Sequence, residues 1–273
     1  MLHVTIWYEY TQESGYLRRD LVRPGISEED FRNFEFYTAQ ASEKIHQVYP
    51  EGLMAPIRKA LEADPQMQVT CATLYDPDFG LPEELLEHTD VLIWWAHISH
   101  DAVPDELVKR IVERIQKGMG FIALHSAHKS KPFMSVLGAS GTLRWREGDF
   151  CRIWNTAPAH PIAEGIPEYF ELEEEEMYGE VFDIPAPDEI VFMSWFSGGE
   201  LLRSGCTWTR GYGKVFYFQP GHETSPSYHN PYILRIICNA VKWAAPAKWR
   251  NEMNCPNILQ SPEMLREKGR KQP

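Results

Sequence analysis

The sequence has no apolar run long enough to cross a membrane. A spanning helix needs roughly 18 consecutive apolar residues, and no stretch of the 273 residues reaches that length. The first ten residues, MLHVTIWYEY, show neither a basic segment nor a small-residue cleavage site, which argues against a secretory signal peptide. We therefore expect a cytoplasmic protein with no membrane partner.

Basic residues are also scarce. There are 27 lysines and arginines against 39 aspartates and glutamates, so that the formal net charge is −12. Nucleic acids and anionic lipid surfaces attract positively charged proteins. The charge balance therefore predicts no nucleic-acid partner and no binding to anionic membrane surfaces.

The cysteines are few and scattered, and no CxxC pair occurs among them. An odd number at wide spacing is typical of reduced thiols in a cytoplasm, and it argues against a disulfide framework or a cysteine-ligated zinc site. The five residues are Cys71, Cys151, Cys206, Cys238 and Cys255.

Short apolar runs alternate with amphipathic segments in the first half of the chain. With 43% apolar and 24% charged residues, the chain can bury the core of one large domain. The alternation predicts an α/β fold with a doubly wound, mostly parallel sheet. The expected strands are 2–7, 68–74, 90–95, 120–124 and 214–218, and the expected helices are 51–63, 82–88, 104–116 and 232–244.

Other segments depart from this pattern. Residues 143–210 form shorter alternating runs between prolines and glycines, which predicts a mixed or antiparallel β extension of the sheet. Residues 11–45 are charged, which indicates an insertion, with a helix that starts near Ser27 as its N-cap. We expect residues 1–246 to form a single domain and residues 247–273 to form an extended polar tail.

Three of the expected strands are each followed closely by a histidine. His97 follows the third strand, His125 the fourth and His222 the last. Ligands of open α/β sheets bind at the carboxyl ends of the strands, so neighbouring strands would bring the three imidazoles together. Histidine is the commonest zinc ligand, and three protein ligands with one open position are typical of catalytic zinc. The pattern predicts a divalent metal site, with zinc as the favoured ion.

The sequence leaves alternatives to this site open. Each histidine alone can be a turn residue that satisfies loop carbonyls, and no HExxH motif is present. A second hypothesis makes Ser126 a nucleophile, with His222 as its base and Glu223 as the orienting acid. However, Leu124 and His128 stand where a G-x-S-x-G turn has glycines. Glu223 can equally be a metal ligand, an orienting group or a general base.

Further polar and aromatic residues are candidates for the same pocket. The acidic run 171–176 is typical of a solvated face, yet it leads directly into Met177-Tyr178, so one or two of its acids can turn inward. Glu200 and Arg203 follow a double glycine, which indicates either a hairpin with a surface ion pair or a loop that binds substrate hydroxyls. The nine tryptophans can stack on a sugar ring.

A series of motifs resembles the trehalose-utilisation (ThuA-like) family. In chain order they are WWAHISHDAVPDELVKRI, GMGFIALHSAHKSKPF, LRWRE, AHPIAEGI, EEEMYGEVFDIPAPDEIVFMSWFSGGE, RSGCTWTRGYGKVFYFQPGHETSP and NAVKWAAP. The resemblance covers residues 50–246 together with the first strand. It implies a flavodoxin-like fold similar to class I glutamine amidotransferases, and a role in the catabolism of trehalose or related disaccharides, including 3-keto sugars.

The resemblance also assigns residues by position. It implies that the family's histidines are His97, His100, His125, His128 and His222, and that its Glu-Met-Tyr stretch is Glu176–Tyr178. Where the family usually has a His-Glu pair after the first strand, this chain has Gln12-Glu13. With the residues above, we predict a catalytic set of Glu223, Glu176, Tyr178 and Ser126, and a substrate-binding set of His100, His128, Glu200 and Arg203.

We expect a metal-dependent enzyme that acts on a sugar or keto-sugar, in which the ion polarises a carbonyl or activates water. Glutamine hydrolysis is not expected, because the turn at His125-Ser126 has no cysteine. The alternative is a non-catalytic sugar-binding or regulatory protein on the same scaffold. Aromatic residues on otherwise polar segments predict a homo-oligomer; they are Phe31, Phe34, Phe36, Tyr37 and Trp249.

Overall fold

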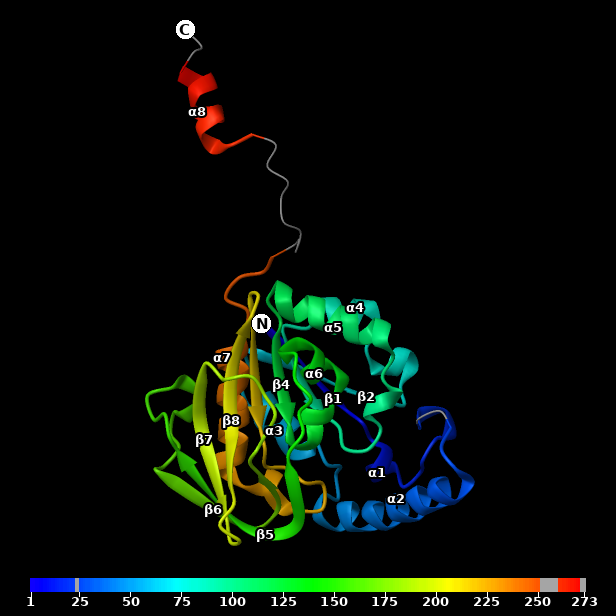
Figure 1. Cartoon of the computed structure of the whole chain (residues 1–273). Coiled ribbons are helices and arrows are strands. Elements are labelled where there is room, and N and C mark those ends of the chain that lie inside the picture. The colour runs from blue at the N-terminus through cyan, green and yellow to red at the C-terminus, as the bar shows by residue number, and fades with distance from the viewer. Residues whose placement is uncertain (23–24, 251–259, 271–273) are drawn as a thin grey trace.

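A computed structural model of the chain describes residues 1–22, 25–250 and 260–270. Within these residues, one nine-stranded sheet has the order β2-β1-β3-β4-β9-β8-β7-β5-β6 (Figure 1). Its parallel strands are β1 (Leu2–Tyr8), β2 (Met67–Thr73), β3 (Val91–Trp95), β4 (Gly120–Leu124) and β9 (Gly213–Phe218). Its antiparallel strands are β5 (Arg144–Asn155), β6 (Tyr169–Gly179), β7 (Glu189–Phe196) and β8 (Leu201–Arg210).

The strand pairing confirms the predicted fold class. β1 pairs with β2 and β3, β3 with β4, and β4 with β9, all in parallel. This half of the sheet has the strand order of a flavodoxin-like fold. From β9 outward every pair is antiparallel, so the middle of the chain extends the sheet, as its alternating pattern predicted.

Helices cover both faces of the parallel half (Figure 1). On one face lie α3 (Ala55–Glu62) and α7 (Pro231–Ala244), and on the other lie α4 (Glu83–His88), α5 (Asp105–Lys117) and α6 (Lys131–Leu137). The connections contain short 3-10 turns, which are η1 (Arg19–Leu21), η2 (Pro77–Gly80), η3 (His100–Ala102), η4 (His125–Lys129), η5 (Pro161–Ala163) and η6 (Pro226–His229). The four helices expected from the sequence are all present, although the first begins only at Ala55.

The helix α7 shows how local sequence fixes the packing. The Asn230 side chain accepts hydrogen bonds from the backbone N–H groups of Tyr232 and Ile233, and so caps the first turn. Burial of one isoleucine or valine side chain contributes about 1.5–3 kcal/mol, which holds this helix against the sheet. Its buried residues recur at helical spacing and are Ile233, Ile236, Ile237, Ala240, Val241 and Ala244.

The carboxyl ends of the central strands are level with one another. Tyr8 pairs with Trp95, Trp95 with Leu124, and Leu124 with Phe218. The residues that follow these four positions therefore leave the sheet at the same edge, which is where α/β sheets bind their ligands.

The segments expected to be an insertion and a tail both contain helices. Residues 11–45 include α1 (Thr11–Ser14) and most of α2 (Glu28–Val48). As predicted, Ser27 caps α2, because its Oγ accepts a hydrogen bond from the N–H of Asp30 at 3.0 Å.

The expectation of a wholly extended tail is wrong for α8 (Pro262–Arg270), whose proline at N1, acidic first turn and helix-forming residues favour a helix. The rest of that segment, including Cys255, lies outside the described residues apart from 247–250 and 260–261. Each helix of the described residues is too short or too polar to span a bilayer.

Candidate metal centre

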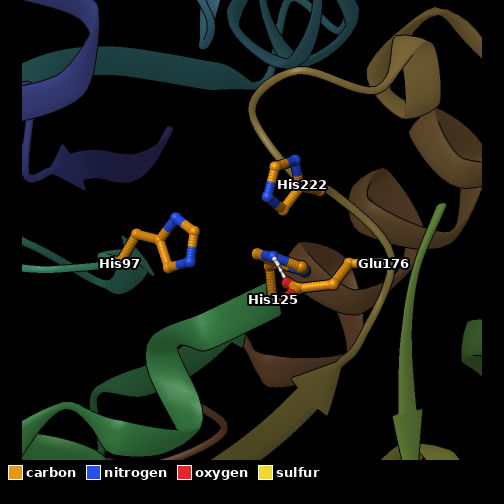
Figure 2. A group of neighbouring side chains, drawn as sticks. All are labelled: His97, His125, Glu176 and His222. Atoms are coloured by element: carbon orange, nitrogen blue, oxygen red, sulfur yellow. Dashed lines mark ion pairs between the residues drawn. The ribbon is translucent and has the colours of Figure 1, made fainter. Parts of the chain in front are cut away.

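His97, His125 and His222 meet at the carboxyl edge of the sheet, together with Glu176 (Figure 2). Each of the four residues offers one ligand atom, and these atoms all lie within 4.8 Å of one another. The histidines come from the ends of three adjacent parallel strands, as the sequence predicted, whereas Glu176 comes from β6 at the far end of the sheet order.

His125 occupies the tight turn that follows β4. Its backbone lies in the left-handed region, with φ of 53°, which is uncommon for a non-glycine residue and occurs preferentially at functional sites. The Nδ1 atom lies 3.0 Å from the carbonyl oxygen of Gln219. Because a carbonyl can only accept, Nδ1 carries the proton and Nε2 is left as the ligand atom.

His97 is oriented by two polar partners on the same ring nitrogen. Its Nδ1 lies 3.1 Å from Oε1 of Gln12 and 3.0 Å from the carboxylate of Glu223. Both partners accept, so Nδ1 is the donor and Nε2 is again free. A carboxylate behind a ligating histidine is a frequent device for fixing the tautomer and raising the basicity of the ligand.

His222 follows a glycine that the fold requires. Gly221 has φ of +133°, and a Cβ atom at this position would lie 2.1 Å from the hydroxyl oxygen of Tyr228. The Nδ1 atom of His222 lies 2.9 Å from the hydroxyl of Thr224. The backbone N–H of Thr224 also donates to this Nδ1, at 3.3 Å, which leaves the proton of the neutral ring on Nε2. Ligation through Nε2 therefore needs the other tautomer, in which Nδ1–H is donated to the Thr224 hydroxyl.

The contact between His125 and Glu176 tests whether a cation fits. Nε2 of His125 lies 3.0 Å from Oε2 of Glu176, and this oxygen is buried without a hydrogen-bond donor in the described residues. With Nδ1 protonated, a neutral ring would direct its lone pair at the carboxylate. Only a proton or a metal cation between them makes this arrangement favourable. Three imidazoles and one carboxylate are also ligands that suit a divalent ion such as zinc.

The electrostatics of the cluster follow from burial and mutual attraction. Burial opposes the protonation of His97, but the adjacent Glu223 carboxylate outweighs it and raises the pKa of His97 to about 9. Burial would raise the pKa of Glu223, yet His97 and His222 hold that pKa well below its usual value. The pKa of Glu176 is likewise lowered, against its burial, by His125. For His222 burial dominates and lowers the pKa. The carboxylates are therefore ionised at neutral pH.

Glu176 reaches the centre because the β5–β6 ladder is irregular. The register shifts on both sides of the Asp149–Glu175 pair, and such bulges re-aim side chains. Consecutive residues of a strand normally face opposite sides, but Glu175 and Glu176 are both buried, at 0% and 5% exposure. In the sequence, the only signal that an acid of this strand turns inward was the acidic run 171–176, which leads into Met177-Tyr178.

A cavity of about 300 Å³ opens beside the cluster. Among its lining residues are six that the sequence predicted for the site: His97, His100, Ser126, His128, Glu176 and Tyr178. The Tyr178 hydroxyl donates to Oγ of Ser126 at 3.1 Å and lies 3.3 Å from Nε2 of His125. In the described residues, Ser126 has no hydrogen bond to His222, so these contacts do not build the nucleophile arrangement.

The sequence missed four further residues of the cavity, Lys129, Leu143, Trp145 and Glu147. Trp145 is 64% exposed, so its indole is available for contact with a ligand in the cavity. Its motif, LRWRE, carried the family resemblance but pointed to no role. Within the part of the chain that the structure describes, Lys129 donates only to neutral oxygens, those of the Ser140 carbonyl and the Thr142 hydroxyl.

His100 and His128 line the cavity as neutral rings. Burial lowers the pKa of each to about 3. Nδ1 of His128 donates to the carbonyl of Gly141 at 2.6 Å, so its Nε2 is an acceptor. Both rings can therefore hydrogen-bond a ligand hydroxyl without adding positive charge.

Glu200 and Arg203, predicted to bind substrate, are not among the residues that line this cavity. Glu200 pairs with Arg146 at 2.7 Å, and Arg203 pairs with Glu180 at 2.8 Å. The alternative of a hairpin with ion pairs is therefore the one that the contacts support. Glu223 is also absent from the cavity wall, and its contacts with Gln12 and His97 fit an orienting role.

Comparisons with known proteins agree with the family resemblance of the sequence and with the fold described above. Residues 36–244 match the family model ThuA, described as trehalose utilisation. The fold is similar to a protein from Parabacteroides merdae described as ThuA-like, with a TM-score of 0.58, 12% identity and 92% of each chain covered. A cytoplasmic protein from Salmonella typhimurium has a TM-score of 0.53 and 15% identity over 72% of this chain and 88% of its own. At these identities the likeness concerns the fold alone. No curated protein matches the sequence significantly.

Proposed function

The chain belongs to the trehalose-utilisation (ThuA) family, and from this membership we propose that it is a metal-dependent enzyme that acts on trehalose-related or 3-keto sugars. One observation carries the proposal: four ligand atoms, from His97, His125, Glu176 and His222, converge within 4.8 Å beside a polar cavity. Burial of the Glu176 and Glu223 carboxylates is costly, and a bound divalent ion would offset that cost together with the imidazoles that pair with them.

The residues of the cluster suit zinc, which binds imidazole and carboxylate ligands. Held by the three imidazoles, a bound ion would keep an open position, where it could polarise a substrate carbonyl or lower the pKa of a water molecule. The Glu176 carboxylate would then lie beside the ion. The chain contributes the orientation of the ligands, through Glu223 and Gln12 behind His97 and the Gln219 carbonyl behind His125.

Tyr178 and Glu176 have suitable properties for handling protons beside the ion. Burial raises the pKa of Tyr178 well above its usual value, so the phenol keeps its proton and can donate a hydrogen bond to a substrate oxygen. Glu176 is ionised and lies on the cavity wall, where a carboxylate can accept a proton from the substrate or from water. Ser126, which accepts the Tyr178 hydrogen bond, lies next to both.

The walls of the cavity suit a sugar ring. The exposed indole of Trp145 offers an apolar face for stacking. Neutral His100 and His128, together with Lys129 and Glu147, offer hydrogen-bond donors and acceptors for hydroxyl groups. This combination of a flat aromatic surface and a few polar groups is typical of small-molecule sites.

We also propose a cytoplasmic homo-oligomer. The Salmonella typhimurium structure of similar fold is described as cytoplasmic. Of the aromatics expected at a subunit contact, Phe31 is buried beneath Arg19 and Trp249 stacks with Arg114 within the chain. The exposed ones, Phe34, Phe36 and Tyr37, all lie on α2 and form the surface that a second copy would cover.

Zinc analysis of freshly purified protein tests the proposed function. We expect about one zinc per chain, and we expect that His97→Ala, His125→Ala and His222→Ala each lose zinc and sugar turnover together. His88 gives the control variant His88→Ala: it is exposed, its ring contacts the Glu84 carbonyl, and it precedes β3, at the end of that strand opposite His97.

Two results would count against the metal-dependent enzyme. If the wild-type protein holds no stoichiometric metal and added zinc changes neither its melting temperature nor any activity, the metal centre is wrong. If the protein treated with chelator still binds sugar with full affinity, and the zinc-loaded protein turns over no sugar, the non-catalytic sugar-binding alternative is favoured instead.

A further inference from the structure

Glu9 is a buried carboxylate that holds the loop carrying His97. It follows β1 directly, at the level edge of the sheet, and is 1% exposed. Its oxygens accept hydrogen bonds from three successive backbone N–H groups, those of His97 at 2.9 Å, Ile98 at 3.0 Å and Ser99 at 2.8 Å. The backbone on both sides of the His97 side chain is therefore fixed to one carboxylate.

Glu175 holds the loop carrying His222 in the same way. It is fully buried, and its oxygens accept from the N–H groups of Gly221 at 2.8 Å and His222 at 3.1 Å. The hydroxyl of Ser227 and the N–H of Glu176 donate to the same carboxylate. Glu175 thus connects the bulged strand β6, which supplies Glu176, to the loop that supplies His222.

The strand ladders cannot provide this support. β3 ends at Trp95 and β9 ends at Phe218, so the amides of the two ligand loops lie beyond the last strand residues. A carboxylate has two oxygens that can together accept about four hydrogen bonds. It can therefore fix several amides of an irregular loop at once.

A purely structural role does not explain the choice of a carboxylate. Neither Glu9 nor Glu175 forms an ion pair with a lysine, arginine or histidine in the described part of the chain. Each carboxyl group is held by N–H and O–H donors instead, and a buried polar group of this kind is costly unless it is hydrogen-bonded. The two carboxylates share one feature, which is that each contacts the backbone of a proposed metal ligand.

We propose that Glu9 and Glu175 are positioning residues of the metal centre, which set the direction of the His97 and His222 imidazoles. This inference rests on the proposed metal-dependent function. Groups that orient metal ligands typically change metal affinity by about 10- to 100-fold when they are replaced. We expect losses of that size without direct contact between either carboxylate and the ion.

The test compares zinc affinity, measured by competition with a chromogenic chelator, in the wild-type protein, Glu9→Gln and Glu175→Gln. Glutamine keeps the size of the side chain but presents an NH₂ group to backbone donors. The matched control is Asp90→Asn. Asp90 immediately precedes β3, at the end opposite His97, and accepts a hydrogen bond from the N–H of His3 at 2.9 Å. We expect about 10- to 100-fold weaker zinc binding in both glutamine variants and unchanged affinity in the control.

Two further measurements separate positioning from general destabilisation. Amide hydrogen exchange with chelator present should show faster exchange at 97–99 in Glu9→Gln alone and at 221–222 in Glu175→Gln alone. In a His222→Ala background, Glu175→Gln should weaken residual zinc binding no further, because the imidazole that it orients is gone. If Glu175→Gln does not fold, Glu9→Gln carries the same test for the other loop.

The outcomes distinguish this inference from the proposed function. If the wild-type protein binds zinc and both glutamine variants bind it with equal affinity, the positioning role is wrong and the metal centre stands. Additive effects of Glu175→Gln and His222→Ala on zinc affinity would also overturn the positioning role. If the wild-type protein binds no zinc, the proposed function fails and the inference fails with it.

Discussion

Gln12 donates a hydrogen bond from its Nε2 to Oε1 of Glu223 at 2.7 Å, across 211 positions of the sequence. The Oε1 atom of the same amide lies 3.1 Å from Nδ1 of His97. One side chain therefore presents a donor to the carboxylate and an acceptor to the imidazole. The segment 11–45, which the sequence marks as a peripheral insertion, thus supplies part of the support for a proposed metal ligand.

Replacing Gln12 tests whether that support matters. Gln12→Leu removes both hydrogen bonds at similar volume, so His97 can turn away from its ligating direction. We expect about 10-fold weaker zinc binding with little change in melting temperature, measured by chelator competition and thermal unfolding. Gln40→Leu, at an exposed position of α2, is the control. Wild-type zinc affinity in Gln12→Leu would show that Glu223 alone orients the ring.

Trp145 should contribute to sugar binding by stacking. Its removal in Trp145→Ala costs about 0.5–1.5 kcal/mol beyond the buried area, so we expect at least about 2- to 12-fold weaker sugar binding by calorimetry. Trp154→Ala is the control, since Trp154 lies on the same strand, is 36% exposed and packs on Tyr169 outside the cavity. Equal losses in the two variants would contradict a specific stacking role.

The hydroxyl of Tyr178 should act in turnover and not in metal binding. Tyr178→Phe removes the donor that contacts Ser126 and His125, and we expect turnover to fall by about 100-fold or more while zinc affinity is unchanged. Tyr217→Phe is a matched control, because the Tyr217 hydroxyl is buried with no hydrogen-bond partner in the described residues. Steady-state kinetics in which both variants lose turnover equally would exclude the proposed role.

The buried neutral ring of His128 should make the protein less stable in acid. Burial lowers the pKa of His128 to about 3, below the value of about 6.5 in an unfolded chain. As the pH falls from 7 to 5, the unfolded state takes up a proton that the folded state does not. The free energy of unfolding therefore decreases, by up to about 2 kcal/mol from this group.

Urea unfolding at pH 7 and pH 5, with chelator present, measures this effect. His128→Asn carries no titratable group, and its amide can still donate to the Gly141 carbonyl, so its stability should fall less between the two pH values than that of the wild type. The same decrease in both proteins would show that other groups cause the acid sensitivity.

The exposed aromatics of α2 should mediate self-association. Phe36 and Tyr37 are 60% and 65% exposed, and light scattering at micromolar concentration should give a mass of at least two chains. Phe36→Ser with Tyr37→Ser should lower that mass, whereas Leu201→Ser, at a 49% exposed position of β8, should not. A monomeric wild-type protein would refute the prediction.

The sequence by itself determined the parallel strands, the covering helices and the end of the sheet at which the site forms. Periodic burial patterns are local, and a histidine next to a strand end is carried to the same edge as its neighbours once the strands pair in register. For this reason His97, His125 and His222 could be predicted as a group, and Ser27 could be predicted as a cap.

Only the tertiary structure decided which other side chains complete the site. Glu176 arrives through an irregular β5–β6 ladder, and Glu9, Gln12 and Glu175 act through hydrogen bonds to residues at least 46 positions away in the sequence. Such contacts depend on how the sheet bends and how loops cross, which no local pattern encodes. The same limit explains why Glu200, placed in the pocket from its flanking glycines, instead forms an ion pair with Arg146.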